Sequence, residues 1–150
     1  ADNVVTWRTG YPFGVNLGRG YPRFNPGEYT ASDVLARREA DAALIVASDP
    51  MANFSRRARE HVKSIPYVAP GPMESPTTRH AAGVFCVATY GINVPGTVYR
   101  MDDVPLPLRP AFDSPFPSDF EILTGIERRV QELKAKCFPP AARSSLRPMA

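Results

Sequence analysis

Two uninterrupted apolar runs dominate the pattern of hydrophobic positions along the chain, one at 42–47 and one at 84–88. Runs of this length without polar alternation are typical of strands that are covered on both faces, as in a parallel sheet. Shorter buried strands are expected at 4–7 and at 67–69. Together these segments predict one sheet, in which 84–88 is a candidate central strand.

Helical patterns fall between the predicted strands. The segment 30–33 (TASD) resembles a capping box and predicts a helix over about 31–40. Ser55 is a suitable N-cap for a second, strongly basic helix over about 55–63. Because strands and helices alternate, the sequence predicts the α/β class, with a mainly parallel sheet flanked by helices.

The pattern changes in the last third of the chain. The apolar segments 98–101 and 104–108 flank Asp102 and Asp103, which predicts a hairpin with a two-residue turn. Two prolines in the second segment, Pro105 and Pro107, suit a strand at a sheet edge.

A C-terminal helix is predicted over about 119–136, where Ser118 and Glu121 form a capping box. Its apolar positions follow a 3-4-3-4 spacing, at Leu123, Ile126, Val130, Leu133 and Cys137. This stripe packs either on the chain's own sheet or against a helix of a partner. The α/β domain is expected to cover 1–137, and 138–150 is expected to be an extended tail, free or draped over a partner.

The segment 9–28 is unusual in composition, with five glycines, three prolines and four aromatic residues in twenty positions. Such a segment is expected to be an ordered loop of fixed shape. It carries Arg19 and Arg23 but only one acid, Glu28. This charge balance suits an anionic group or the acidic surface of a partner. The alternative is a purely structural loop that packs on a neighbouring polypeptide.

Candidate ligand positions follow the predicted strands, because ligands of α/β sheets bind beyond the carboxyl ends of the strands. Here those ends are 48–50 (SDP) and 70–74 (PGPME). Asp49 is a candidate acid-base group or acceptor for a ligand hydroxyl, or else it caps the next turn. Of the two histidines, His61 is expected at the surface and His80 in a structural role. No catalytic constellation is expected.

Charge and composition exclude several classes of partner. The net charge is only +3, from 18 Lys and Arg against 15 Asp and Glu, with no basic run, so nucleic acid is not an expected partner. No stretch approaches the roughly 20 apolar residues of a membrane span. The two cysteines, Cys86 and Cys137, have no metal-ligand spacing, so we expect two reduced thiols in a cytoplasmic protein.

Three segments in order resemble the B subunit of formylmethanofuran dehydrogenase and, more widely, the pterin-binding fold of molybdenum and tungsten oxidoreductases. They are 20–28 (GYPRFNPGE), 41–50 (DAALIVASDP) and 96–102 (GTVYRMD). In that wider group, a strand ending in small-polar-Pro meets the nucleotide end of a tungsto- or molybdopterin. The resemblance covers about 1–136.

The chain also departs from the family pattern. The family's metal site uses a Cys or selenocysteine with a neighbouring His, and no Cys-His pair exists here. Where the family often carries an acid before Gly96, this chain has Val94 and Pro95. The resemblance therefore implies a chain without metal or pterin. Its residual cofactor-facing or partner-facing candidates are Arg19, Arg23, Asn25, Ser48, Asp49 and Thr97.

A branch of the family fits these departures. In the bacterial formyltransferase/hydrolase complex, the resemblance implies that other subunits move a formyl group from tetrahydromethanopterin to a methanofuran-like carrier, and that a zinc subunit releases formate. The sequence thus predicts a non-catalytic, scaffold-type subunit of that complex. The alternatives are a fragment of a tungsten or molybdenum dehydrogenase catalytic subunit and an unrelated nucleotide-binding module.

Overall fold

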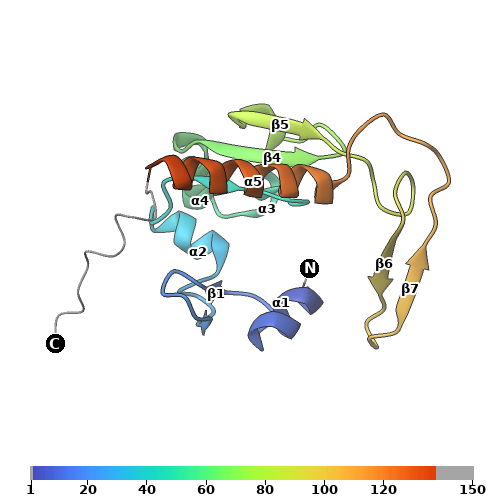
Figure 1. Cartoon of the computed structure of the whole chain (residues 1–150). Helices are drawn as coiled ribbons and strands as arrows, with labels where there is room; N and C mark the ends of the chain where they lie inside the picture. The colour runs from blue at the N-terminus through green and yellow to red at the C-terminus, as the bar shows by residue number, and fades with distance from the viewer. Residues whose placement is uncertain (1, 138–150) are drawn as a thin grey trace. The chain divides into compact units, whose positions relative to one another are not determined.

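The computed structural model describes residues 2–137, with side chains from Thr6 onward. The chain divides into two compact units, residues 1–85 and 86–150, which are described separately (Figure 1). The predicted tail at 138–150 lies outside the described residues.

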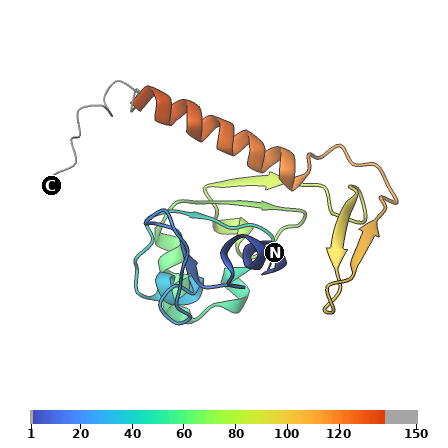
Figure 2. The same cartoon turned by 60° about the horizontal axis from the view of Figure 1, so that its bottom comes forward.

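The first unit contains the predicted parallel sheet. Strands β3 (Ala43–Leu44), β4 (Tyr67–Gly71) and β5 (Gly83–Cys86) lie in the order β3-β4-β5. β3 and β4 pair in parallel, with Ala43 opposite Tyr67. Both views place the helices α2 (Ala31–Ala36), α3 (Pro50–Asn53) and α4 (Arg56–Ser64) on one side of this sheet (Figures 1 and 2). The α/β class predicted from the sequence is confirmed.

Three helices and the sheet enclose the core of this unit. They are α2 (Ala31–Ala36), α3 (Pro50–Asn53) and α4 (Arg56–Ser64). α4 begins as predicted, because the Ser55 hydroxyl accepts a hydrogen bond from the backbone N–H of Ala58. The buried apolar residues of the core are Leu35, Ile45, Met51, Ala58, Val62, Tyr67 and Ala69.

The sheet is covered less completely than its apolar runs predict. Ile45 is buried, but its neighbours Leu44 and Val46 remain 49 % and 37 % exposed. On β5, Val84 and Phe85 are exposed as well. The expectation that 42–47 is covered on both faces is therefore wrong for the described residues, since Leu44 and Val46 are partly exposed. The expectation that 84–88 is a central strand is also wrong for them, because β5 is an edge of the sheet.

The N-terminal segment also differs from its prediction. Residues 4–7 belong to helix α1 (Asp2–Thr9), not to a strand. Gly10, at a φ of +80°, closes this helix with a hydrogen bond from its N–H to the Thr6 carbonyl. A short apolar run does not distinguish a helix from a strand by periodicity alone, which explains the error.

Helix α2 is shorter than the predicted span of 31–40. It ends at Ala36, and Arg38 follows at a φ of +62°, a conformation that a helix does not continue through. The expected capping box is also absent at its start. The Thr30 hydroxyl accepts from the N–H of Gly27 instead, so this threonine holds the preceding loop.

The second unit contains the predicted hairpin, formed by β6 (Gly96–Tyr99) and β7 (Pro105–Leu108) in antiparallel pairing. The pair forms a two-stranded sheet of its own. Its turn has three residues rather than two, since the N–H of Arg100 donates to the Val104 carbonyl and Asp103 has a φ of +61°. A type I turn followed by a left-handed residue is the usual three-residue solution, and it explains why Asp-Asp suffices without glycine.

Helix α5 (Asp119–Cys137) begins with the predicted capping box. The Ser118 hydroxyl accepts from the N–H of Glu121, and the Glu121 carboxylate accepts from the backbone N–H of Ser118 at 2.8 Å. The backbone N–H and the hydroxyl of Ser118 both donate to this carboxylate, and these two bonds lower the pKa of Glu121. Farther along the apolar stripe, Val130 and Leu133 remain exposed.

Candidate functional site

A hollow of about 380 Å³ lies beyond the carboxyl ends of β3 and β4 in the first unit. The sequence predicted that 48–50 and 70–74 would follow these two strands, and the structure brings both segments to this hollow. Its lining comprises Ile45, Ala47, Ser48, Asp49, Ala69, Pro70, Gly71, Pro72, Met73, Glu74, Ser75 and Thr78. Ligands of α/β sheets bind beyond the carboxyl ends of the strands, and in this protein that position is a concave surface.

A buried threonine organises the residues beside the hollow. Thr77 is 1 % exposed, and its hydroxyl donates to Oδ1 of Asp49 while accepting from the N–H of Met51 at 3.1 Å. The phenol of Tyr67 donates to the Thr77 carbonyl at 2.6 Å. Burial, together with the charge of Asp49, raises the pKa of Tyr67. These bonds connect β4, the start of α3 and the segment after β4.

Asp49 therefore has a structural partner that the sequence did not reveal. Its carboxylate makes no capping bond to α3, so the alternative role as a side-chain cap is not seen. Thr77 supplies one hydrogen bond, and no second one to the Asp49 carboxylate is found within residues 2–137. Beside it, Ser48 is exposed, and Ala47 has a φ of +50°, an unusual conformation for alanine.

The glycine- and proline-rich segment is ordered around a small hairpin. β1 (Val15–Asn16) pairs antiparallel with β2 (Arg23–Phe24). Aromatic packing stabilises this hairpin, because the ring of Tyr11 stacks on Phe24 with centroids 4.6 Å apart and Phe13 meets Phe24 edge-on at 6.1 Å. The fixed loop predicted for 9–28 thus includes a short β-hairpin.

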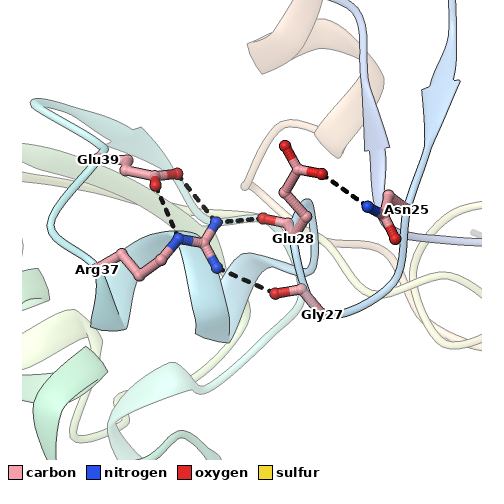
Figure 3. A network of polar contacts seen from close by, with 5 residues as sticks. All are labelled: Asn25, Gly27, Glu28, Arg37 and Glu39. Carbon is pink, nitrogen blue, oxygen red and sulfur yellow. Dashed lines mark hydrogen bonds and ion pairs between the residues drawn. The ribbon is translucent and has the colours of Figure 1, made fainter.

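Arg37 fastens this segment to α2, as Figure 3 shows. Its Nη1 donates to the Gly27 carbonyl at 3.0 Å and its Nη2 to the Glu28 carbonyl. Nε also pairs with the Glu39 carboxylate at 2.7 Å, which raises the pKa of Arg37 and lowers that of Glu39. A planar fork with five donors can hold all these acceptors at once.

The sequence did not indicate that Arg37 holds backbone carbonyls of the loop. Its two carbonyl partners lie nine and ten residues earlier in the chain, and no local pattern connects them to Arg37. Its neighbour in space, Glu28, is also engaged, because the Asn25 amide donates to its carboxylate at 2.7 Å (Figure 3). The single acid of the loop is thus satisfied within the loop.

Arg19 and Arg23 differ in their surroundings. The Arg23 guanidinium lies 5.1 Å from the centre of the Tyr29 ring, and its Nε is buried without a hydrogen bond. Arg19 is exposed and makes no ion pair with any residue that the structure describes. That these two arginines face a partner or a carrier stays a prediction.

The remaining candidates are not among the residues that line the hollow. Thr97 is exposed on β6, opposite Pro107, in the second unit. The nearby Gly96 has a steric reason to be glycine, since a Cβ there would lie 2.9 Å from the Tyr90 ring. His61 is buried rather than at the surface, and its Nε2 donates to the Ala40 carbonyl at 2.6 Å. His80 is exposed.

Two kinds of feature are absent from the described part of the chain. Within residues 2–137, no three His, Cys, Asp or Glu side chains are grouped so that they could hold a metal ion. Over the same residues, every helix is too short or too polar to cross a membrane.

Comparison with curated proteins confirms the resemblance inferred from the three motifs. The chain is 48 % identical over 134 residues to the B subunit of tungsten-containing formylmethanofuran dehydrogenase 2 from Methanocaldococcus jannaschii. It is 44 % identical over 135 residues to the protein of the same name from Methanococcus maripaludis. These matches cover 88 % and 89 % of the chain but 31 % of each relative, so the chain spans about a third of their length. No family model matches the chain.

A solved structure shares the fold. It is that of the formyltransferase/hydrolase complex of Methylorubrum extorquens in complex with methylofuran. The superposition has a TM-score of 0.71 and covers 90 % of this chain and 37 % of that one, at 23 % sequence identity. At this identity the likeness shows the fold alone.

Proposed function

The chain is related to the B subunits of the formylmethanofuran dehydrogenases, and from this kinship we propose that it is a non-catalytic scaffold in a formyltransferase/hydrolase complex. Partner subunits of such a complex would transfer a formyl group from tetrahydromethanopterin to a methanofuran-like carrier. A zinc-containing partner would then hydrolyse the carrier-bound formyl group to formate. This chain would hold those subunits together without contributing a reacting group.

The observation that carries this proposal is the apolar surface of each unit. In the first unit, the sheet exposes apolar side chains on β3 and β5, and in the second unit α5 exposes part of its stripe. The residues concerned are Leu44, Val46, Val84, Phe85, Val130 and Leu133. Large exposed apolar patches mark surfaces that another polypeptide covers.

The polar contacts of the first unit support a structural role as well. The Thr77 hydroxyl donates to Asp49 inside the fold, and the Arg37 guanidinium donates to backbone carbonyls of this chain and pairs with Glu39. Thr77 beside the hollow and Arg37 beside the 9–28 loop thus hold the chain's own backbone in place.

The hollow itself is a poor match for the phosphates of a pterin nucleotide. Two carboxylates, Asp49 and Glu74, line it, and no Lys or Arg is among its lining residues. Glu74 is paired with Arg79, whereas Asp49 has no ion pair with any residue of 2–137 and accepts only the Thr77 hydroxyl. A carboxylate and the Ser48 hydroxyl suit a hydroxyl-bearing group rather than an anion. We therefore propose that this chain alone holds no pterin.

A second candidate function rests on sequence identity. The chain is 48 % and 44 % identical to subunits of tungsten-containing enzymes, against 23 % for the formyltransferase/hydrolase complex. Under this alternative, the chain is one part of a tungsten-dependent catalytic subunit, and the metal ligands lie in the rest of that subunit. Both candidates require further polypeptide that covers the exposed apolar faces of this chain. They differ in which metal the assembly contains.

We expect the chain expressed alone to be less stable than the same chain in its native assembly. Burial of the exposed apolar faces stabilises only the assembled state, so the unfolding temperature should rise on assembly by about 5 °C or more. Thermal unfolding followed by circular dichroism, with size-exclusion chromatography of both samples, measures this difference. A chain that is monomeric alone and equally stable in both states contradicts the scaffold proposal.

A further inference from the structure

One edge of the sheet in the first unit is open. The N–H groups of Ala43 and Ile45 donate to the Pro66 and Val68 carbonyls of the β4 side, at 3.2 and 2.9 Å. Successive residues of a strand direct their backbone groups to opposite sides. The backbone groups of Leu44 and the N–H of Val46 therefore point away from β4. Since β3 is the first strand in the sheet order, no described strand receives them.

An apolar hollow lies next to this edge. It measures about 450 Å³ and is bounded by β3, by the start of α3 and by α2 with the residues that precede it. Its apolar lining includes Tyr29, Val34, Leu35, Leu44, Val46 and Phe54. An open strand edge beside an apolar hollow is the arrangement that binds an added strand, whose backbone pairs with the edge while its side chains enter the hollow.

β3 is short, with two residues, but the edge lacks the charged side chains and prolines that keep many natural sheet edges from pairing. Exposed edge strands usually carry Lys, Pro or inward-pointing charges. Here the run 42–47 consists only of Ala, Leu, Ile and Val, and the charges come only at Asp41 and Asp49, outside the run. Six consecutive apolar residues are the pattern of a strand inside a sheet whose two faces are covered. Here the ladder to β4 comprises only the pairs of Ala43 and Leu44 and the bond from the Ile45 N–H to Val68, all on one side of the strand.

We propose that the outer edge of β3 receives a further β-strand, supplied by polypeptide outside these 150 residues, with apolar side chains that fill the hollow. The occupant that we infer is the remaining part of the subunit, because the chain covers 31 % of each relative and the related subunits therefore contain further polypeptide that can supply the strand. The inference rests on the proposed function in so far as it requires an assembly, and it applies to either family candidate.

Hydrogen exchange on the native assembly tests the added strand directly. The amides of Leu44 and Val46 should exchange roughly a hundredfold or more slowly in the assembly than in the isolated chain. The Ile45 amide, already bonded to Val68, serves as the internal reference in both samples. Free exchange at Leu44 and Val46 in an intact assembly overturns the added strand and leaves the scaffold proposal standing.

Two further outcomes of the same experiment are decisive. Protection of Leu44 and Val46 in the isolated chain that disappears on dilution shows that a second copy pairs with β3, and overturns the inference. A chain that purifies from its native source without any other polypeptide, and exchanges freely at both amides, overturns the inference and the proposed function together.

A charged residue introduced at the edge of β3 tests the added strand by mutation. Val46→Asp places a carboxylate where the added strand would cover it, so the affinity for the rest of the assembly should fall about tenfold or more. Val46 is 37 % exposed, so the isolated chain should keep its circular dichroism spectrum. Met101→Asp is the control, because Met101 is fully exposed at the hairpin tip. Equal assembly of both variants counts against the added strand.

Discussion

Thr77→Val is expected to destabilise the first unit by about 2–4 kcal/mol. Valine has the shape of threonine but removes the hydroxyl that Met51 N–H donates to and that donates to Asp49. Met51 is buried, so its N–H would lose its acceptor without gaining water. The midpoint of urea unfolding, followed by circular dichroism, measures the loss.

Thr77→Ser is the matched control, because it keeps the hydroxyl and removes only a methyl group. We expect it to retain most of the stability that Thr77→Val loses. If the valine variant unfolds within about 0.5 kcal/mol of the unmodified chain, Thr77 does not organise the strand ends, since surface substitutions without a structural role have effects of that size.

Arg37→Ala is expected to loosen the segment that carries Arg19 and Arg23. The variant loses the bonds that hold the Gly27 and Glu28 carbonyls to α2. Because the guanidinium is partly exposed, we expect local opening, and with it trypsin cleavage after Arg19, to increase about three- to tenfold. Mass spectrometry of the early fragments identifies the cleavage site.

Two variants define what the Arg37 result means. Arg37→Lys keeps the charge but lacks the planar fork, so it should resemble Arg37→Ala more than the unmodified chain. Arg57→Ala also removes one trypsin site, and Arg57, exposed on α4, has no ion pair among the described residues. Cleavage after Arg19 at the same rate in Arg37→Ala and Arg57→Ala contradicts a clamp by Arg37.

Local patterns predicted most of the elements of this fold. The Ser55 cap of α4 and the capping box of α5 each lie within four residues, so adjacent side chains reveal them. The placement of the strand ends followed from a general rule for α/β sheets, and 48–50 does meet 70–74 at one hollow.

Long-range contacts account for what the sequence did not show. Thr77 meets Asp49 across 28 positions, and His61 meets Ala40 across 21, with no spacing that signals either pair. The apolar run at 42–47 is a different case. Its pattern predicts a strand covered on both faces, while the described residues leave Leu44 and Val46 partly exposed, and this difference is the reason for proposing an added strand.

The composition of the native assembly tests the scaffold proposal most directly. The assembly would be isolated through an affinity tag on this polypeptide, and its subunit masses, metals and pterin measured together. We predict several co-purifying subunits, zinc in one partner, and no tungsten, molybdenum or pterin. Stoichiometric tungsten or molybdenum with a pterin would contradict it and would instead favour the catalytic subunit of a dehydrogenase.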